Sequence, residues 1–231
     1  MDVIWDALGD AFNLLFSGDH ETFEIIGLSL RISLTATVIA FALGLPLGML
    51  LAFGRFRGRR LALATVHTGM GMPPVVVGLI VTVMLWRSGP LGGLDMLYTP
   101  SAMIVAQAAI GAPLVAGISA AALQQIDPDF RVQMQALGAS RLRSLWAVAV
   151  EARLPLLAAV MAGFGAAVSE VGAAMMVGGN IAGETRVLTT AAVLETSKGN
   201  LALAVALGLI LLLLAFMVNL VLTLAQQRGR P

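Results

Sequence analysis

The chain has 231 residues, of which 58% are hydrophobic and 12% are charged. A soluble domain usually carries about 25% charged residues, so this composition predicts an integral membrane protein of the all-α class. The sequence has no cysteine and only the histidines His20 and His67, which excludes disulfides and Cys/His metal centres. We expect no metal site, no resident cofactor and no nucleic-acid partner.

The amino-terminal segment, residues 1–24, holds six acidic residues and no lysine or arginine. A secretory signal would begin with a basic region, so this segment is not expected to be one. Residues 1–17 are apolar enough to form an amphipathic helix on the outer membrane surface, although they are too few and too acidic to span the membrane.

Five apolar runs follow this segment. An α-helix crosses the ~30 Å hydrocarbon layer with about 20 such residues. Runs of roughly this length lie at residues 25–53, 61–86, 100–123, 155–177 and 201–224. They predict five transmembrane helices in one domain, residues 1–231, with a cytoplasmic loop at 124–154 and an outer loop at 178–200.

The orientation follows from the basic residues, because basic loops stay on the cytoplasmic side. Ten of the 14 basic residues fall on alternate connections. These are Arg55, Arg57, Arg59, Arg60, Arg131, Arg141, Arg143, Arg153, Arg228 and Arg230. The other connections carry Arg87, Arg186 and Lys198, and Arg31 lies within the first span. The amino terminus is therefore predicted outside and the carboxyl terminus in the cytoplasm.

The loop at residues 124–154 contains signals for two short helices. Asp127 and Pro128 form an N-cap and first-turn pair, Gly138 suits a left-handed helix end, and Ser140 can cap a second helix. The apolar side chains are predicted to share one face of each helix. These are Phe130, Met134 and Leu137 in the first helix, and Leu142, Leu145, Trp146 and Ala149 in the second, where Arg141, Ser144 and Ala147 lie away from the stripe.

This loop resembles the cytoplasmic coupling motif of ATP-binding-cassette importer permeases, which runs Glu-Ala-Ala, three residues, Gly, nine residues, Ile-x-Leu-Pro. Gly138 stands for the glycine, Ala139-Ser140-Arg141 and Leu145-Trp146 match common usage, and Val148 and Val150 occupy the Ile and Leu positions. The chain departs from the motif at Val132-Gln133-Met134 and at Glu151, where the proline is delayed to Pro155.

A second set of stretches resembles the tungstate-specific branch of these permeases, over nearly the whole chain, and the delayed proline is not unusual in that branch. The stretches are Pro73-Pro74-Val75-Val76-Val77-Gly78-Leu79, Ser169-Glu170-Val171-Gly172, Met175-Met176-Val177-Gly178-Gly179-Asn180-Ile181, Thr185-Arg186-Val187-Leu188-Thr189-Thr190 and Leu194-Glu195-Thr196.

The resemblance implies the type I importer permease fold and a homodimer in a prokaryotic inner membrane, surrounded by lipid. It also implies two cytosolic ATPase subunits that bind ATP and Mg, and an extracytoplasmic substrate-binding protein. The chain has no GxxxxGK[ST] motif, so it is expected not to be an enzyme by itself. The ATPase-coupling residues implied are Gly138, Ala139, Ser140, Arg141, Leu142, Arg143 and Leu145. An ordinary solvated connection is the alternative.

Candidate residues for the translocation path or gate lie elsewhere. Pro73 and Pro74 remove backbone donors from the second span, which indicates either a packing kink or a break that lines the path. Glu170, the only acid well inside a span, is either structural, protonated or paired with Arg31, or part of a gate. The outer loop adds Asn180, Thr185, Arg186, Thr189 and Thr190, which either contact a tetrahedral dianion or only meet water and the binding protein.

Other functions stay open at this point. Molybdate, sulfate or another small solute are alternatives to tungstate. A stand-alone carrier or channel would favour intramembrane relays or inverted repeats, and the spans offer only Arg31 and Glu170. An intramembrane enzyme is disfavoured because the chain lacks HExxH, a cysteine nucleophile and paired carboxylates within its spans.

Overall fold

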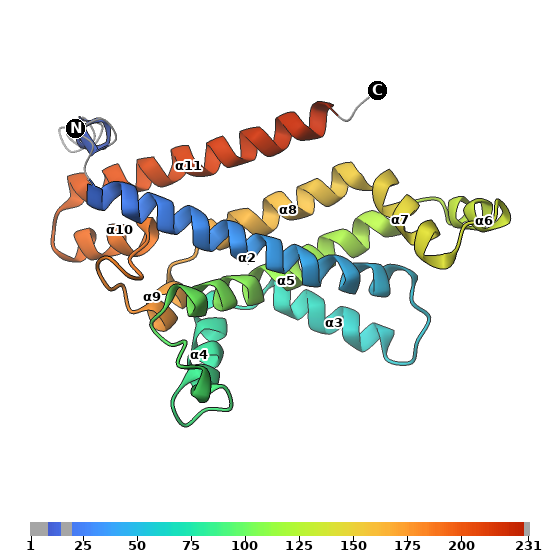
Figure 1. Ribbon diagram of the computed structural model, residues 1–231, viewed down its shortest axis with the longest axis horizontal. Helices are drawn as coiled ribbons and strands as arrows, with labels where there is room; N and C mark the ends of the chain where they lie inside the picture. The colour runs from blue at the N-terminus through green and yellow to red at the C-terminus, as the bar shows by residue number, and fades with distance from the viewer. Residues whose placement is uncertain (1–8, 15–19, 229–231) are drawn as a thin grey trace.

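The computed structural model is built from α-helices, with no strand in residues 9–14 and 20–228, which are the residues it describes (Figure 1). Residues 9–14 are helical, and the rest of the amphipathic helix predicted at residues 1–17 lies outside the described residues. Ala11 is buried against the core beside Ile25 and Leu188, so this short helix packs on the bundle.

Three helices are long and apolar enough to cross a membrane: α2 (His20–Phe53), α5 (Pro100–Gln124) and α11 (Leu201–Arg228). They coincide with the first, third and fifth predicted spans. By length and composition the described residues offer three spans, or up to five if each bent helix pair counts as one.

Helix α5 is the centre of the bundle, since it packs against α2, α3, α4, α8 and α9. Its start is fixed by the Thr99 hydroxyl, which accepts a hydrogen bond from the Ala102 amide, and by Pro100 at the first helical position. The close contact with α2 runs through Gly44 and Gly48, where an added Cβ would lie 2.9 Å from the carbonyl oxygens of Ala112 and Ala116 respectively. Such small residues let apolar helices approach closely.

The second predicted span, residues 61–86, is not one helix. It consists of α3 (Arg59–Met70) and α4 (Pro74–Leu85), whose axes differ by 103°. Pro73 adopts an extended ψ of 126° and has no N–H, so the helix cannot continue through it. The break that the two prolines predict within the second span is confirmed.

The fourth predicted span, residues 155–177, is also divided. It consists of α8 (Arg153–Val168) and α9 (Gly172–Gly178), which are separated by residues 169–171. Ahead of this span, α7 (Arg141–Glu151) meets α8 at a bend of 73°. At the end of α8 the Ser169 hydroxyl donates a hydrogen bond to the Gly165 carbonyl at 2.7 Å. A continuous helix through Glu170 was therefore the wrong prediction.

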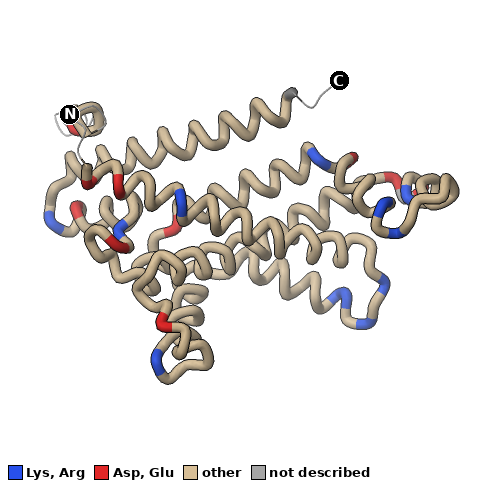
Figure 2. The backbone as a smooth tube through the Cα atoms, viewed as in Figure 1, with Lys and Arg blue, Asp and Glu red and all other residues tan. Residues whose placement is uncertain are grey.

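The remaining elements lie at the two ends of the bundle (Figure 1). Helix α6 (Pro128–Ala136) and α7 form one end, together with the α2–α3 connection. The short 3-10 helix η1 (Gly92–Leu94) follows α4, and α10 (Leu188–Ser197) packs against α11. Figure 2 shows a group of basic residues around α6, α7 and the α2–α3 connection, and the sequence places these arginines on one side of the membrane.

Candidate functional site

Residues 127–151 have the local structure that the sequence predicts. An Asp127 carboxylate oxygen accepts a hydrogen bond from the Asp129 amide at 2.9 Å, so α6 begins where expected. Gly138 has φ of 84°, in the left-handed region that favours glycine. The Ser140 hydroxyl accepts from the Arg143 amide at 3.3 Å and caps α7. Helix, glycine break and helix are all confirmed.

Helix α7 has a buried side and an exposed side. Ser144, Val148 and Ala149 are buried, and Val148 and Ala149 pack with Leu123 and Leu156. The apolar stripe is divided: Leu142 is 78% exposed and Trp146 is 71% exposed. Ser144 lies away from Leu142 and Trp146, as predicted, and the predicted stripe is divided because Ala149 is buried.

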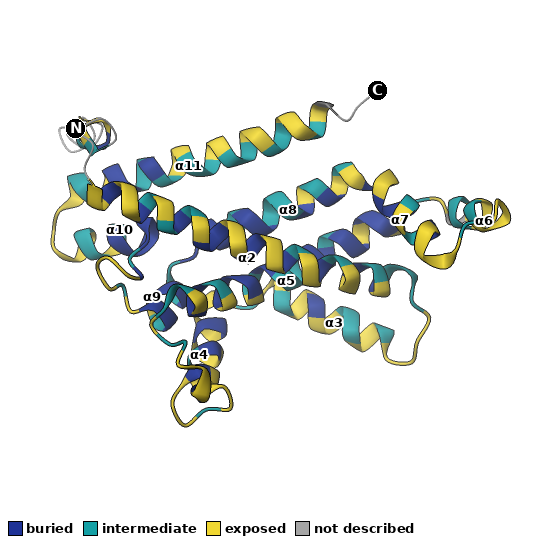
Figure 3. Ribbon diagram, in the orientation of Figure 1, coloured by how far each residue is buried: buried dark blue, intermediate teal, exposed yellow. Residues whose placement is uncertain are grey.

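A similar division occurs on α6. Phe130 packs against the buried cluster at this end, while Leu137 is 79% exposed and does not share its face. Leu142 and Trp146 are one helical turn apart, and Arg141 and Arg143 beside them are exposed as well (Figure 3). We call Leu142 and Trp146 the α7 apolar pair. An apolar surface flanked by charges is typical of a protein contact.

The two helix breaks, at residues 71–73 and 169–171, are far apart in the sequence but lie against each other. A Cβ added to Gly172, the first residue of α9, would lie 2.7 Å from Val75 in the first turn of α4. A Cβ added to Gly78 would lie 2.6 Å from the Cα of Ala173. The amino ends of α4 and α9 are therefore neighbours. Pro73 and Pro74, at the start of α4, are exposed.

Glu170 lies between α8 and α9 and is only 7% exposed. One carboxylate oxygen accepts a hydrogen bond from the Ala173 amide at 2.8 Å, which satisfies a donor in the first turn of α9. Its main-chain carbonyl accepts a hydrogen bond from the Thr189 hydroxyl at 3.0 Å, which joins α10 to this break. Among the described residues no ion pair links Glu170 to Arg31, so the predicted alternative of that pairing is not found.

The threonines of residues 178–200 use their hydroxyls within the protein. Thr185 is completely buried; its hydroxyl donates to the Gly178 carbonyl at 2.6 Å and accepts from the Ile181 amide at 2.9 Å. The Thr190 hydroxyl accepts from the Val187 amide at 3.0 Å, at the start of α10. These groups fix the loop geometry, and a contact with a passing anion would require them to exchange partners.

Ser29 is a structural residue that sequence reasoning missed. Its hydroxyl in α2 accepts a hydrogen bond from the Leu188 amide at 2.9 Å and donates to the Ile25 carbonyl. The available signal was the group of polar residues near the start of the first span, which includes Ser29, Ser33 and Thr37. Together with Thr189 and Glu170, Ser29 joins α2, α10 and the α8–α9 break into one buried polar junction.

Two polar residues within 178–200, Asn180 and Arg186, each have a buried side-chain atom without a hydrogen-bond partner among the described residues. Asn180 has φ of 53°, and its side-chain oxygen is buried without a hydrogen-bond partner among the described residues. An Arg186 terminal nitrogen lies 3.4 Å from a Glu21 carboxylate oxygen, while its Nε has no partner in the described part of the chain. Arg31 and Arg186 line an open cleft of about 290 Å³ together with Glu21, Glu24 and Glu184. The cleft has mixed charge and holds no complete anion cage.

The structure combines long apolar helices, two broken helices that meet, and an exposed apolar pair beyond an arginine-rich connection. These features define a multi-pass membrane protein of the transport class. The chain belongs to the family of binding-protein-dependent transport system inner membrane components, whose family model matches residues 44–231.

Curated relatives cover nearly the whole chain. It is 40% identical over 227 residues to the tungstate uptake system permease protein TupB of Peptoclostridium acidaminophilum, covering 98% of this chain and 100% of the relative. It is 35% identical to TupB of Campylobacter jejuni, covering 96% and 92% respectively.

Solved structures have the same fold. A chain of the MetNI methionine ABC transporter, in an inward-facing conformation, matches with a TM-score of 0.76 at 18% identity, covering 94% of this chain and 99% of that one. The predicted membership of the ABC importer permeases is confirmed.

Proposed function

We propose that this chain is the permease subunit of an ATP-driven, binding-protein-dependent tungstate importer in a prokaryotic inner membrane. The observation that carries the proposal is the 40% identity to a tungstate uptake permease over 98% of the chain. The active unit is a homodimer of five-span subunits, with two cytosolic ATPase subunits that bind ATP and Mg and with a binding protein outside. The distribution of arginine supports an outside amino terminus and a cytoplasmic carboxyl terminus.

Coupling to ATP hydrolysis is assigned to the segment around Gly138–Leu145, extended to Trp146 by its exposure. In this proposal the α7 apolar pair enters a groove of the ATPase, while Arg141 and Arg143 steer the approach. Gly138, Ala139 and Ser140 set the angle of α7. Burying a fully exposed leucine or tryptophan side chain stabilises an interface by about 2 kcal/mol or more.

The translocation path is assigned to the place where α4 and α9 meet. Breaks in membrane helices are tolerated where protein or water meets the freed backbone groups, and such breaks line the paths of many transporters. Pro73, Pro74 and Glu170 shape this region, and Asn180, Thr185, Arg186, Thr189 and Thr190 form the outer loop above it. In this proposal Glu170 holds α9 in place, and the outer loop acts as the gate.

Reconstitution tests the substrate and the class of protein. The permease is assembled in liposomes with its ATPase and binding protein, and ATP hydrolysis is measured against the concentration of tungstate, molybdate and sulfate. We expect tungstate to stimulate at the lowest concentration. Stimulation by sulfate or molybdate below that concentration would overturn the substrate assignment, and no stimulation by any oxyanion would overturn the class.

A pair of variants tests the coupling surface. Leu142→Ser changes a side chain that is 78% exposed in the first turn of α7, and Leu61→Ser changes one that is 73% exposed in the first turn of α3. We expect Leu142→Ser to weaken association with the ATPase by about tenfold or more and Leu61→Ser to leave it unchanged. Equal losses in both variants would show that the effect is one of general surface polarity.

A further inference from the structure

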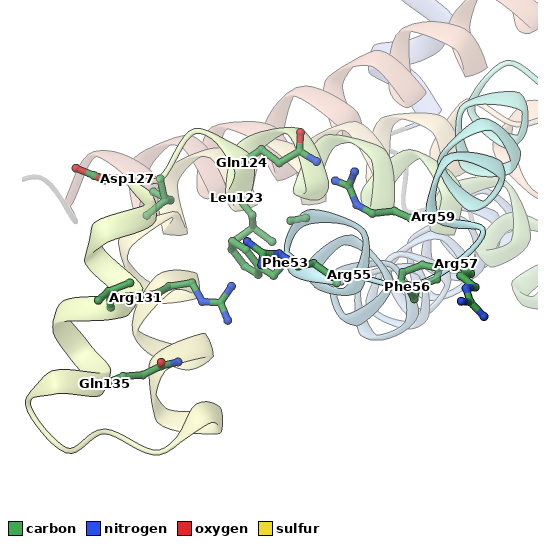
Figure 4. A pocket seen from close by; sticks show the side chains of 14 residues that line it. Phe53, Arg55, Phe56, Arg57, Arg59, Leu123, Gln124, Asp127, Arg131 and Gln135 are labelled. Atoms are coloured by element: carbon green, nitrogen blue, oxygen red, sulfur yellow. The ribbon is translucent and has the colours of Figure 1, made fainter.

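A wide cleft lies at the end of the bundle where α2 stops being apolar. It has a volume of about 980 Å³ and lies between the end of α2, the connection to α3, the end of α5 and α6 (Figure 4). Helix α2 is uncharged from residue 32 to its end at Phe53, and four arginines follow within seven residues. That change in polarity marks a membrane–water boundary, whichever side of the membrane it faces.

The lining of the cleft is strongly basic. It includes Arg55, Arg57, Arg59 and Arg131, while Asp127 is the only acid among the described lining residues. The Asp127 carboxylate already accepts a hydrogen bond from the start of α6, so part of its capacity is used. Four guanidinium groups against one carboxylate make the cleft a site for an anion.

Arg131 is held in a way that leaves its charge available. The guanidinium carbon lies 4.4 Å from the ring centroid of Phe53, a cation–π contact, and Figure 4 shows the side chain extending from α6 toward that ring. Its Nε has no hydrogen-bond partner among the described residues. The stacking on Phe53 therefore positions the group, and no carboxylate in the described part of the chain neutralises it.

Arg59 has a different part. Its Nε donates a hydrogen bond to the Leu51 carbonyl at 2.8 Å, at the last turn of α2. It thereby satisfies one of the free carbonyls at the helix end and fixes the α2–α3 connection. Arg55 and Arg57, in contrast, are exposed. The cleft thus has one fixed arginine, one stacked arginine and two that can adjust to a ligand.

The walls between these arginines are apolar. Phe53, Phe56, Leu123, Ile126 and Val132 line the same cleft, with Phe56 41% exposed and Val132 64% exposed. A free inorganic anion would neither contact the apolar walls favourably nor fill a volume of about 980 Å³. A ligand with a negative head and an apolar body matches both halves of the lining, and the boundary position supplies such a ligand in the bilayer itself.

We propose that this cleft binds the phosphate headgroup of an anionic phospholipid, with Arg131 and Arg55 contacting the phosphate and the apolar walls contacting the glycerol and upper acyl region. The bound lipid joins the α2–α3 connection to α6, and so attaches residues 127–151 to the rest of the bundle. This inference depends on the cleft alone and not on the transported anion.

Native mass spectrometry of the purified full-length permease tests the proposal, with phosphatidylglycerol and phosphatidylcholine titrated as matched probes. We expect phosphatidylglycerol to bind more tightly, and Arg131→Gln to weaken it about five- to tenfold without changing phosphatidylcholine binding. Arg60→Gln is the control, because Arg60 is exposed and one residue from Arg59 but does not line the cleft. It removes the same charge and should leave the preference intact.

Several outcomes would overturn the proposal. Equal affinity for the two lipids would exclude headgroup recognition, and an equal loss in Arg60→Gln would reduce it to general surface charge. Displacement of phosphatidylglycerol by millimolar inorganic phosphate would assign the cleft to free anions instead. Absence of a lipid preference, combined with weaker ATPase association in Arg131→Gln, would assign it to the protein partner. If Arg131→Gln does not fold, the exposed Arg55→Gln replaces it with the same expected loss.

Discussion

The contact between α2 and α5 provides a quantitative test of the fold, through Gly48. A Cβ on Gly48 would lie 2.9 Å from the Ala116 carbonyl oxygen, 2.9 Å from the Ser119 Cβ and 3.2 Å from the Ala120 amide nitrogen. Two of these atoms belong to the backbone of the central helix and cannot move aside alone. The substitution Gly48→Ala therefore forces α2 away from α5.

Gly27→Ala is the matched control within the same helix, because nothing lies within 4 Å of the position that its Cβ would take. Replacing glycine by alanine in a helix stabilises it by up to about 1 kcal/mol, and both variants gain this. Overpacking costs about 1–3 kcal/mol. The propensity gain cancels in the difference, so Gly48→Ala should be about 1–3 kcal/mol less stable than Gly27→Ala.

The assay is equilibrium unfolding of the purified permease in mixed micelles with increasing sodium dodecyl sulfate, followed by near-ultraviolet circular dichroism. The free energies of unfolding of the two variants are compared with that of the parent chain. Gly27→Ala should be equal to the parent or slightly more stable. If Gly48→Ala is as stable as Gly27→Ala, the close approach of α2 and α5 is refuted.

Three further variants test residues 170–195. Thr185→Val leaves the buried Gly178 carbonyl and the partly buried Ile181 amide without their hydroxyl partner, and should lower the free energy of unfolding by about 1–3 kcal/mol in the same titration. Glu170→Gln keeps an acceptor for α9, so the complex should assemble while tungstate-stimulated ATP turnover changes; normal turnover would count against a gating role. The pKa of Glu195 is held below its ordinary range by a hydrogen bond from Asn200 and then by Lys198. That stabilisation is present above the ordinary carboxyl pKa of about 4.3 and lost as the pH falls through the lowered value, so Glu195→Gln should melt below the parent at pH 7 and together with it at strongly acid pH.

Sequence patterns predicted the long helices and the helix caps well, because both depend on residues close together in the chain. The apolar runs identified α2, α5 and α11, and the ends of α6 and α7 followed from Asp127 and Ser140. A cap acts over about three residues, so its chemistry is visible without tertiary structure. The helix break at Pro73 and Pro74 was predicted for the same reason.

The position of α9 could not be predicted in this way. Residues 155–177 are apolar throughout except at Ser169 and Glu170, and hydropathy does not distinguish one long helix from a helix, a turn and a short helix. The break is set by contacts far away in sequence: Gly172 against Val75, and the Thr189 hydroxyl on the Glu170 carbonyl. The 103° angle between α3 and α4 likewise depends on packing and not on the two prolines alone.

The division of the apolar stripe on α7 has a physical reason that bears on function. Amphipathic patterns assume that the largest apolar side chains face the protein core. On α7 the core contact is made by Ser144 and Val148, both fully buried, while Leu142 and Trp146 point away from it. A large apolar side chain on the outer face of a packed helix indicates that another molecule covers it in the assembled complex.

Exposed apolar side chains on α11 and on α7 require different surroundings. Leu212, Phe216 and Val221 on α11 are more than 60% exposed, and the helix carries no charge from Leu201 to Gln227, so the hydrocarbon layer can cover them. Helix α7 carries Arg141, Arg143 and Glu151 within 11 residues, and placing it in hydrocarbon would bury these charges. Leaving the apolar pair exposed to water is also unfavourable, at about 25 cal/mol for each Å² of apolar surface. Only a protein surface covers an apolar pair while leaving its charged neighbours solvated, and this argues for the ATPase as the partner of α7.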